Sequence, residues 1–147
     1  MQTLRYVGAA LAVLVASLHL FHPDLGFPRL VRYIETGTLW DPRPALFTAS
    51  GILIVAGILL VYNELARRSV YLLGIVLMAA YILGYGAWHT VLEHGGFWPH
   101  IEAHGHSDSG PIEVIITHLW DDHVALVSKL SELALLVVLV VLYWNDA

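Results

Sequence analysis

The sequence contains no cysteine in 147 residues, and it contains few charged residues. The absence of thiols excludes disulfide bonds, thiolate metal ligands and thiol catalysis, and it leaves no cysteine-based indication of the redox compartment. Charged residues make up 13% of the chain, against roughly 25% in a typical soluble domain. The net charge of −5 offers no basic surface to a nucleic acid, so we expect no nucleic-acid partner.

Hydrophobic residues are abundant instead, at 58%, and they gather in four long runs. A helix needs about 20 apolar residues to cross a bilayer. We therefore predict one transmembrane domain over residues 1–147, with helices at about 4–21, 45–63, 69–92 and 112–144. The first run resembles a secretory signal peptide because small residues lie near its end, but we interpret it as a retained membrane helix.

The link between the second and third runs is short and carries Arg67 and Arg68. A short link implies that the two helices run in opposite directions, and basic residues in short loops mark the cytoplasmic side of a membrane. These rules predict an all-α, antiparallel, up-down-up-down four-helix bundle in the cell membrane, with both termini on the cytoplasmic side. Three arginines in the first outer loop, Arg29, Arg32 and Arg43, argue against that orientation.

All nine histidines fall at one end of this predicted bundle, which the topology places outside the cytoplasm. They end the first and third helices, occupy the loop that follows and begin the fourth helix: His19, His22, His89, His94, His100, His104, His106, His118 and His123. Histidine-rich tracts can gather metal ions loosely. For most of the loop histidines we favour a solvated role, with Phe97 and Trp98 anchoring the loop at the membrane interface.

The fourth predicted helix carries a polar stripe that reaches into the membrane. At 100° per residue, Asp121, Lys129 and Glu132 share a face with His118. A charge at the bilayer centre costs about 2.5–3.5 kcal/mol on insertion scales, so we expect Lys129 and Glu132 to point into the bundle. The facing residues expected on the third helix are Tyr81 and Tyr85. A buried ion pair that only fixes helix packing is the structural alternative.

Two His-x-x-x-acid pairs lie at the facing ends of the third and fourth helices, and the first helix ends in two further histidines. Because the helices are antiparallel, imidazoles and carboxylates are expected to converge there. The predicted metal ligands are His19, His22, His89, Glu93, His118 and Asp122. This donor set suits Zn, Fe, Mn or Cu(II). We therefore hypothesise a membrane protein that binds a divalent transition metal, for metal handling or metal-dependent chemistry.

Four other interpretations remain open at this stage. The histidines can be interfacial groups that hydrogen-bond to acids and water, without any metal. A haem b, held by His19 with His89 or His118, would indicate a small cytochrome or an accessory subunit of a respiratory complex. An ion or proton pathway can follow the polar stripe of the fourth helix. The chain can also be a structural partner subunit, or a homo-oligomer, without chemistry of its own, and enzymatic activity stays undecided.

Overall fold

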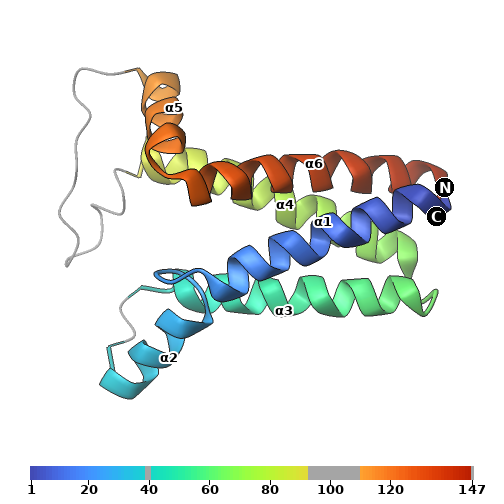
Figure 1. Ribbon diagram of the computed structural model, residues 1–147, viewed down its shortest axis with the longest axis horizontal. Coiled ribbons are helices and arrows are strands. Elements are labelled where there is room, and N and C mark those ends of the chain that lie inside the picture. The colour runs from blue at the N-terminus through green and yellow to red at the C-terminus, as the bar shows by residue number, and fades with distance from the viewer. Residues whose placement is uncertain (39–40, 93–109, 147) are drawn as a thin grey trace.

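The computed structural model describes residues 1–38, 41–92 and 110–146 (Figure 1). The described part of the chain forms helices without strands, and it contains six of them. Their bounds are α1 Gln2–Phe21, α2 Phe27–Thr36, α3 Arg43–Tyr62, α4 Arg67–His89, α5 Pro111–Asp121 and α6 His123–Asn145. The chain is therefore all-α, as its composition predicts.

Within the described ranges, four helices are long and apolar enough to cross a membrane, namely α1, α3, α4 and α6. Their outward surfaces are apolar rather than polar: Leu53 of α3 and Leu73 of α4 are 64% and 68% exposed. Large exposed aliphatic side chains on every long helix would be unfavourable in water and are favourable against lipid. These features are those of a multi-pass membrane protein in contact with the bilayer.

The helix α2 lies in a segment where the sequence analysis placed only a loop. Its start carries Pro28 and its end carries Gly37, which adopts the left-handed conformation with φ 67°. Proline near a helix start and glycine just after a helix end are ordinary boundary signals. The apolar residues at 27, 30, 31 and 34 share one face about 100° wide at 100° per residue. The helix is thus amphipathic, and at 10 residues it is too short to span a bilayer.

The fourth predicted helix is divided into α5 and α6, and this corrects the single helix expected over 112–144. Asp122 adopts extended backbone angles between the two helices, and its side chain accepts hydrogen bonds from the backbone N–H groups of Val124 and Ala125. It therefore caps α6 at its N-terminus. The polar stripe predicted over residues 118–132 is likewise divided between two helices. His118 and Asp121 belong to α5, whereas Lys129 and Glu132 belong to α6.

The helices α1 and α6 form the centre of the bundle. The helix α6 packs extensively on α4 and on α1, and α1 packs on α3. The pair α3 and α4 is joined by a short link but makes far less contact along its length. A small core at mid-height consists of Ala12, Val15, Met78 and Leu135.

The two ends of the bundle differ in what they carry. Both chain termini lie at one end, which we call the terminal end, where Arg5 of α1 binds Asp146 after α6 (Figure 1). The opposite end, which we call the histidine end, carries His22, His89 and His118, together with α2 and α5. In Figure 1 these two short helices turn away from the long helices on opposite sides of the bundle.

Candidate functional site: a buried polar cluster among four helices

Glu132 of α6 has no exposed surface, although it carries a carboxylate in the middle of an apolar bundle. Its Oε1 accepts hydrogen bonds from Ser128 Oγ at 2.9 Å and from Lys129 Nζ at 2.8 Å. Its Oε2 accepts a second bond from Lys129 Nζ at 2.6 Å. The imidazole Nε2 of His19 lies 3.1 Å from the same Oε1. A carboxylate with this number of neighbouring donors is stabilised in its ionised form.

His19 of α1 lies between Glu132 and the hydroxyl of Ser50 on α3, and it is 1% exposed. Its Nδ1 is 3.3 Å from Ser50 Oγ, and Ser50 Oγ is 2.7 Å from the hydroxyl of Tyr81 on α4. The imidazole ring lies against the rings of Tyr81 and Phe47, with centroids 4.3 Å and 4.9 Å away. One histidine thus joins polar groups from all four long helices.

The hydrogen-bond inventory allows this site to hold different numbers of protons. Ser50 Oγ lies 2.9 Å from the carbonyl oxygen of Phe47 and has one proton to donate. If that proton goes to Phe47, both nitrogens of His19 face acceptors, and two N–H groups are needed. If Ser50 donates to His19 Nδ1 instead, one N–H directed at Glu132 is enough. Rotation of one hydroxyl therefore accommodates either the imidazolium or the neutral imidazole.

Lys129 of α6 completes the ion pair from the side facing α4. Its side chain is 16% exposed, and its Nζ lies 5.6 Å and 5.3 Å from the ring centroids of Tyr81 and Tyr85. Cations are attracted to aromatic faces at such distances. The same Nζ lies 3.5 Å from the backbone carbonyl oxygen of Tyr81. The two tyrosines expected on the facing helix thus lie beside the lysine.

A second group of imidazoles lies at the histidine end. The rings of His89 on α4 and His118 on α5 have centroids 4.7 Å apart. His89 Nδ1 lies 2.9 Å from the carbonyl oxygen of Tyr85, and His118 Nδ1 lies 2.8 Å from that of Val114. Each contact implies an N–H on Nδ1, since a carbonyl only accepts. In the neutral tautomer, Nε2 then carries the lone pair.

His22 and Asp122 lie where α1 and α5 end. The Nδ1 of His22 accepts hydrogen bonds from the backbone N–H groups of Asp24 and Leu25, each at 3.2 Å. Burial lowers the pKa of His22 from its ordinary value, although the negative charges of Asp24 and Asp122 oppose that change. Asp122 is also near enough to Tyr85 for their charges to interact. Titratable groups therefore continue from the buried cluster toward the histidine end.

The predicted metal ligands are distributed among these groups. His19 contacts Glu132, His89 contacts His118, His22 ends α1, and Asp122 caps α6. Glu93 lies outside the described residues, as do the histidines at positions 94–106, and Asp121 is exposed. Among residues 1–38, 41–92 and 110–146, no three His, Asp or Glu side chains converge closely enough to hold a metal ion.

The serine hydroxyls beside His19 and Glu132 were not anticipated from the sequence, whereas Tyr81 was. Ser50 lies in a mainly apolar helix, two residues after Thr48, and is 4% exposed, and Ser128 precedes Lys129 by one residue. A lone serine inside a membrane span is a weak signal, because a hydroxyl can also bond to the carbonyl of the preceding turn. Ser50 has this bond as well, to Phe47. The partners across the bundle become visible only when the helices are packed together.

The terminal end carries a separate polar group, which we call the terminal cluster and which consists of Arg5, Tyr71 and Asp146. Arg5 donates to both carboxylate oxygens of Asp146, and the Tyr71 hydroxyl donates to Asp146 Oδ2 at 2.7 Å. The hydrogen bonds from Arg5 hold the pKa of Asp146 below its ordinary value. Three helices are joined there: α1, α4 and the end of α6.

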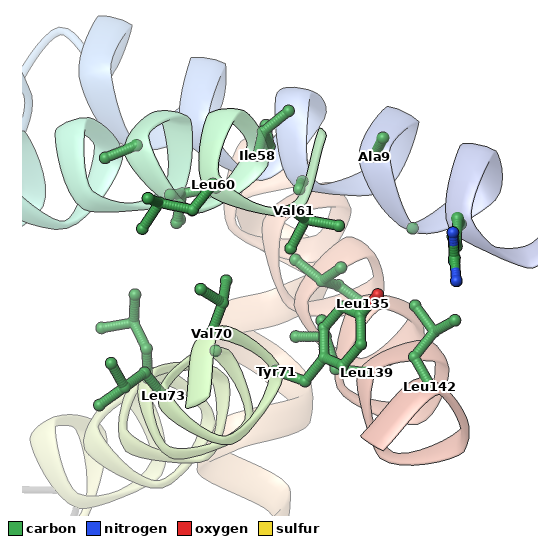
Figure 2. A pocket seen from close by; sticks show the side chains of 18 of the residues that line it. Ala9, Ile58, Leu60, Val61, Val70, Tyr71, Leu73, Leu135, Leu139 and Leu142 are labelled. Atoms are coloured by element: carbon green, nitrogen blue, oxygen red, sulfur yellow. The ribbon is translucent and has the colours of Figure 1, made fainter. Parts of the chain in front are cut away.

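Between the buried cluster and the terminal cluster lies an apolar cavity of about 640 Å³. All four long helices line it, and Figure 2 shows side chains of α3 and α4 facing each other across the opening between those helices. The core residues Ala12, Met78 and Leu135 form its inner limit. Polar groups line the cavity only toward the terminal end, where Arg5 and Tyr71 contribute to its wall.

Comparisons of the chain with protein-family models, with curated proteins and with solved structures found no match. The function must therefore be argued from the site itself.

Proposed function

We propose that the protein is a proton-exchange protein of the membrane, in which the buried cluster of His19, Ser50, Tyr81, Lys129 and Glu132 takes up and releases a proton. The observation that supports this most directly is the 3.1 Å contact between His19 Nε2 and Glu132 Oε1 inside the bundle. Ionisable side chains within membrane spans are costly, and they commonly mark proton or ion pathways. The cluster accommodates a charged or a neutral imidazole by rotation of one serine hydroxyl.

The proton reaches the cluster from the histidine end in this proposal. The ring of Tyr85 lies beside both Lys129 and His89, and the ring of His89 lies beside that of His118, so these groups lead from the cluster toward that end. His22 and Asp122 follow α1 and α5 at the same end. On the other side, the cavity that begins near Met78 has an apolar wall. Apolar cavities of this kind hold no ordered water, so they conduct protons poorly. The arrangement therefore supports exchange with one side of the membrane.

Infrared difference spectroscopy of the protein in lipid nanodiscs tests the exchange. Lowering the pH stepwise from 9 to 4 should change the carboxyl and imidazole bands of the cluster as one proton is taken up. Glu132→Gln should abolish this change, because the amide neither ionises nor stabilises the imidazolium of His19. The matched control is Glu35→Gln on the exposed surface of α2, which should leave the cluster signal intact.

An ion pair that serves packing alone would give a different result. The wild-type spectrum would then show no pH-dependent band that depends on Glu132, and the proposal would be wrong. A band that persists unchanged in Glu132→Gln would also contradict it. Nitrogen-15 NMR of labelled histidine gives an independent measurement of His19, because the chemical shifts of the two ring nitrogens change differently on protonation.

A divalent metal at the histidine end is a second proposal, and the geometry of His89 and His118 favours it. The Nδ1 of each ring is bonded to a backbone carbonyl, which is how proteins commonly orient a ligating histidine through its other nitrogen. The two rings approach from different helices. Glu93 or Asp122 is the further ligand that the sequence suggests, and zinc, iron, manganese or copper fits such a set.

Elemental analysis after equilibration with zinc tests this second proposal. Ligating histidines must be neutral, so bound zinc should fall as the pH drops below about 6.5. His118→Ala should lose most of the metal, while His123→Ala, an exposed histidine two residues after α5, should lose little. The metal site would be refuted if neither the wild type nor the His123→Ala protein bound zinc, iron, manganese or copper. Haem binding stays a prediction, and a Soret band would test it.

The orientation in the cell is part of the proposal. We place the Arg67–Arg68 link in the cytoplasm and the histidine end outside, with the four long helices alternating in direction. A cysteine introduced at Ser69 should then react with impermeant reagents only from the cytoplasmic side. Labelling of this cysteine from the outside would reverse the orientation, and the histidine end would then lie on the cytoplasmic side.

A further inference from the structure

The apolar cavity extends along one half of the membrane. Its lining on α1 runs from Gln2 to Ala12, and its lining on α4 runs from Val70 to Ala80. Each stretch is about 15 Å long at 1.5 Å per residue. The hydrocarbon core of a bilayer is about 30 Å thick, so this length corresponds to one leaflet. The depth of the cavity thus matches the apolar chain of a single membrane lipid.

The opening of the cavity follows from the packing of the helices. The helices α3 and α4 stay close where the short link joins them, and at that level a Cβ added to Gly57 would meet Val70 at 3.2 Å. Apart from that contact these two helices touch little along their lengths, and in Figure 2 Leu60 of α3 and Leu73 of α4 lie on opposite sides of the space between them. In a bilayer this space faces lipid. If the cavity of about 640 Å³ were left empty, the apolar side chains that line it would lose dispersion contacts.

The rim of the cavity carries groups that suit a lipid headgroup. Gln2, Arg5, Tyr6 and Tyr62 line it at the terminal end, and Tyr62 is 84% exposed. Two more arginines, Arg67 and Arg68, line an adjoining hollow together with the acids Glu64 and Asp146. Arg5 and Arg67 pair with Asp146 and Glu64, whereas Arg68 lies over the ring of Tyr143, so the arginines there exceed the acids by one. Guanidinium groups bind phosphate oxygens well.

From these observations we propose that the cavity is a binding site for one anionic phospholipid, whose chain lies between α3 and α4 and whose phosphate meets the arginines at the terminal end. This site goes beyond the proton exchange proposed above, because no residue of the buried cluster lines the cavity. The lipid also fills the space that the four long helices leave in this half of the bundle. Its loss would leave proton binding at Glu132 in place.

Native mass spectrometry of the purified protein, released from nanodiscs of stated composition, tests the site. In nanodiscs of equal parts phosphatidylglycerol and phosphatidylcholine, one phosphatidylglycerol should remain bound per chain, at least tenfold in excess over phosphatidylcholine. Ala9→Phe places a ring in the cavity from α1 and should reduce the retained lipid at least tenfold (Figure 2). Ala10→Phe, on the neighbouring exposed position of α1, is the matched control and should retain it.

Three outcomes would overturn the site. They are no retained lipid in the wild type, equal retention in the wild type and Ala9→Phe, and equal retention of the two lipids. If Ala9→Phe does not fold, Ala80→Phe fills the cavity from α4 and makes the same prediction. The infrared signal of Glu132 serves as the folding control, because the lipid site and the proton site are separate.

Discussion

Two carboxylates at different depths bind basic side chains in this protein, and their surroundings differ. Glu132 has no exposed surface and lies at the centre of the bundle, where it meets Lys129 and His19. The side chain of Asp146 is 3% exposed at the terminal end, where the side chain of its partner Arg5 is 34% exposed. The first pair lies among apolar helices, whereas the second has access to the membrane boundary. The same charge pairing therefore operates in two dielectric environments.

This difference indicates what each carboxylate can do. An ion pair whose cation is partly exposed is weakened by solvent screening, so it mainly fixes the position of helix ends. A buried pair suffers a large desolvation penalty, and proteins retain such pairs where the charge has a role or where the pair specifies the packing. The buried pair here has a third member, the imidazole of His19. The terminal cluster has a tyrosine in the corresponding place.

The largest expected effect comes from removing the charge of Glu132. Glu132→Gln leaves Lys129 buried without its counter-ion, and breaking a buried pair in this way lowers the free energy of unfolding by about 3–5 kcal/mol. Chemical denaturation in detergent micelles measures it. The double variant Lys129→Met with Glu132→Met should lose much less, because no unpaired charge remains. Equal losses in the single and the double variant would show that the ion pair does not determine the stability.

A smaller effect is expected from Asp146→Asn at the terminal end. Hydrogen bonds to charged groups contribute about 1.5–3 kcal/mol, and Arg5 keeps its access to water when Asp146 is neutral. The pKa of Asp146 is lowered in the folded protein, so its contribution is complete above the unfolded pKa of about 3.9. That contribution is lost as the pH falls through the lower folded pKa.

The stability difference between the wild type and Asp146→Asn should therefore shrink below about pH 4, the unfolded pKa region. Thermal unfolding in detergent at pH 7 and at pH 3 measures it. Asp121→Asn on the exposed surface of α5 is the control and should change stability by less than about 0.5 kcal/mol. A difference that grows on acidification would refute the assignment of Asp146 to the ion pair.

The smallest effect concerns the backbone beside the terminal cluster. Glu64 and Ala66, in the link between α3 and α4, have positive φ angles of 61° and 49°. The left-handed conformation costs a residue with a side chain about 1–2 kcal/mol, and glycine avoids that cost. Ala66→Gly should therefore leave the melting temperature unchanged or slightly raised. Ala80→Gly inside α4 should lower stability by about 0.5–1 kcal/mol, and similar losses in both variants would argue against strain in the link.

The sequence predicted the membrane spans well because their signal is local. Twenty consecutive apolar residues are sufficient to identify a span, whatever surrounds them. Because this signal averages over about 20 residues, it also led to two errors in the predicted helix boundaries. The amphipathic pattern and the flanking Pro28 and Gly37 of α2 were overlooked in a loop between spans, and the cap at Asp122 was overlooked inside a longer apolar run. Both boundaries depend on one or two residues, so a window of 20 residues averages them away.

The sequence could name the ionisable residues of the candidate site but could not assign their partners. Helical periodicity brought Lys129 and Glu132 onto one face and predicted their ion pair at i,i+3. It gave no measure of how far α1 is shifted relative to α6. That shift decides whether His19 meets Glu132 or a residue of α4, and it depends on the packing of small side chains in the core.

By itself, then, the sequence determined that the described part of the chain is helical, that it carries four apolar spans and that the histidines of the described residues lie toward one end of those spans. Those properties follow from composition and from periodicity along a single helix. Only the tertiary structure decided that His19 binds Glu132, that His89 lies against His118, and that α3 and α4 separate around a cavity. Such contacts join residues far apart in the chain, and they arise from the angles and offsets at which helices pack, which no single segment encodes.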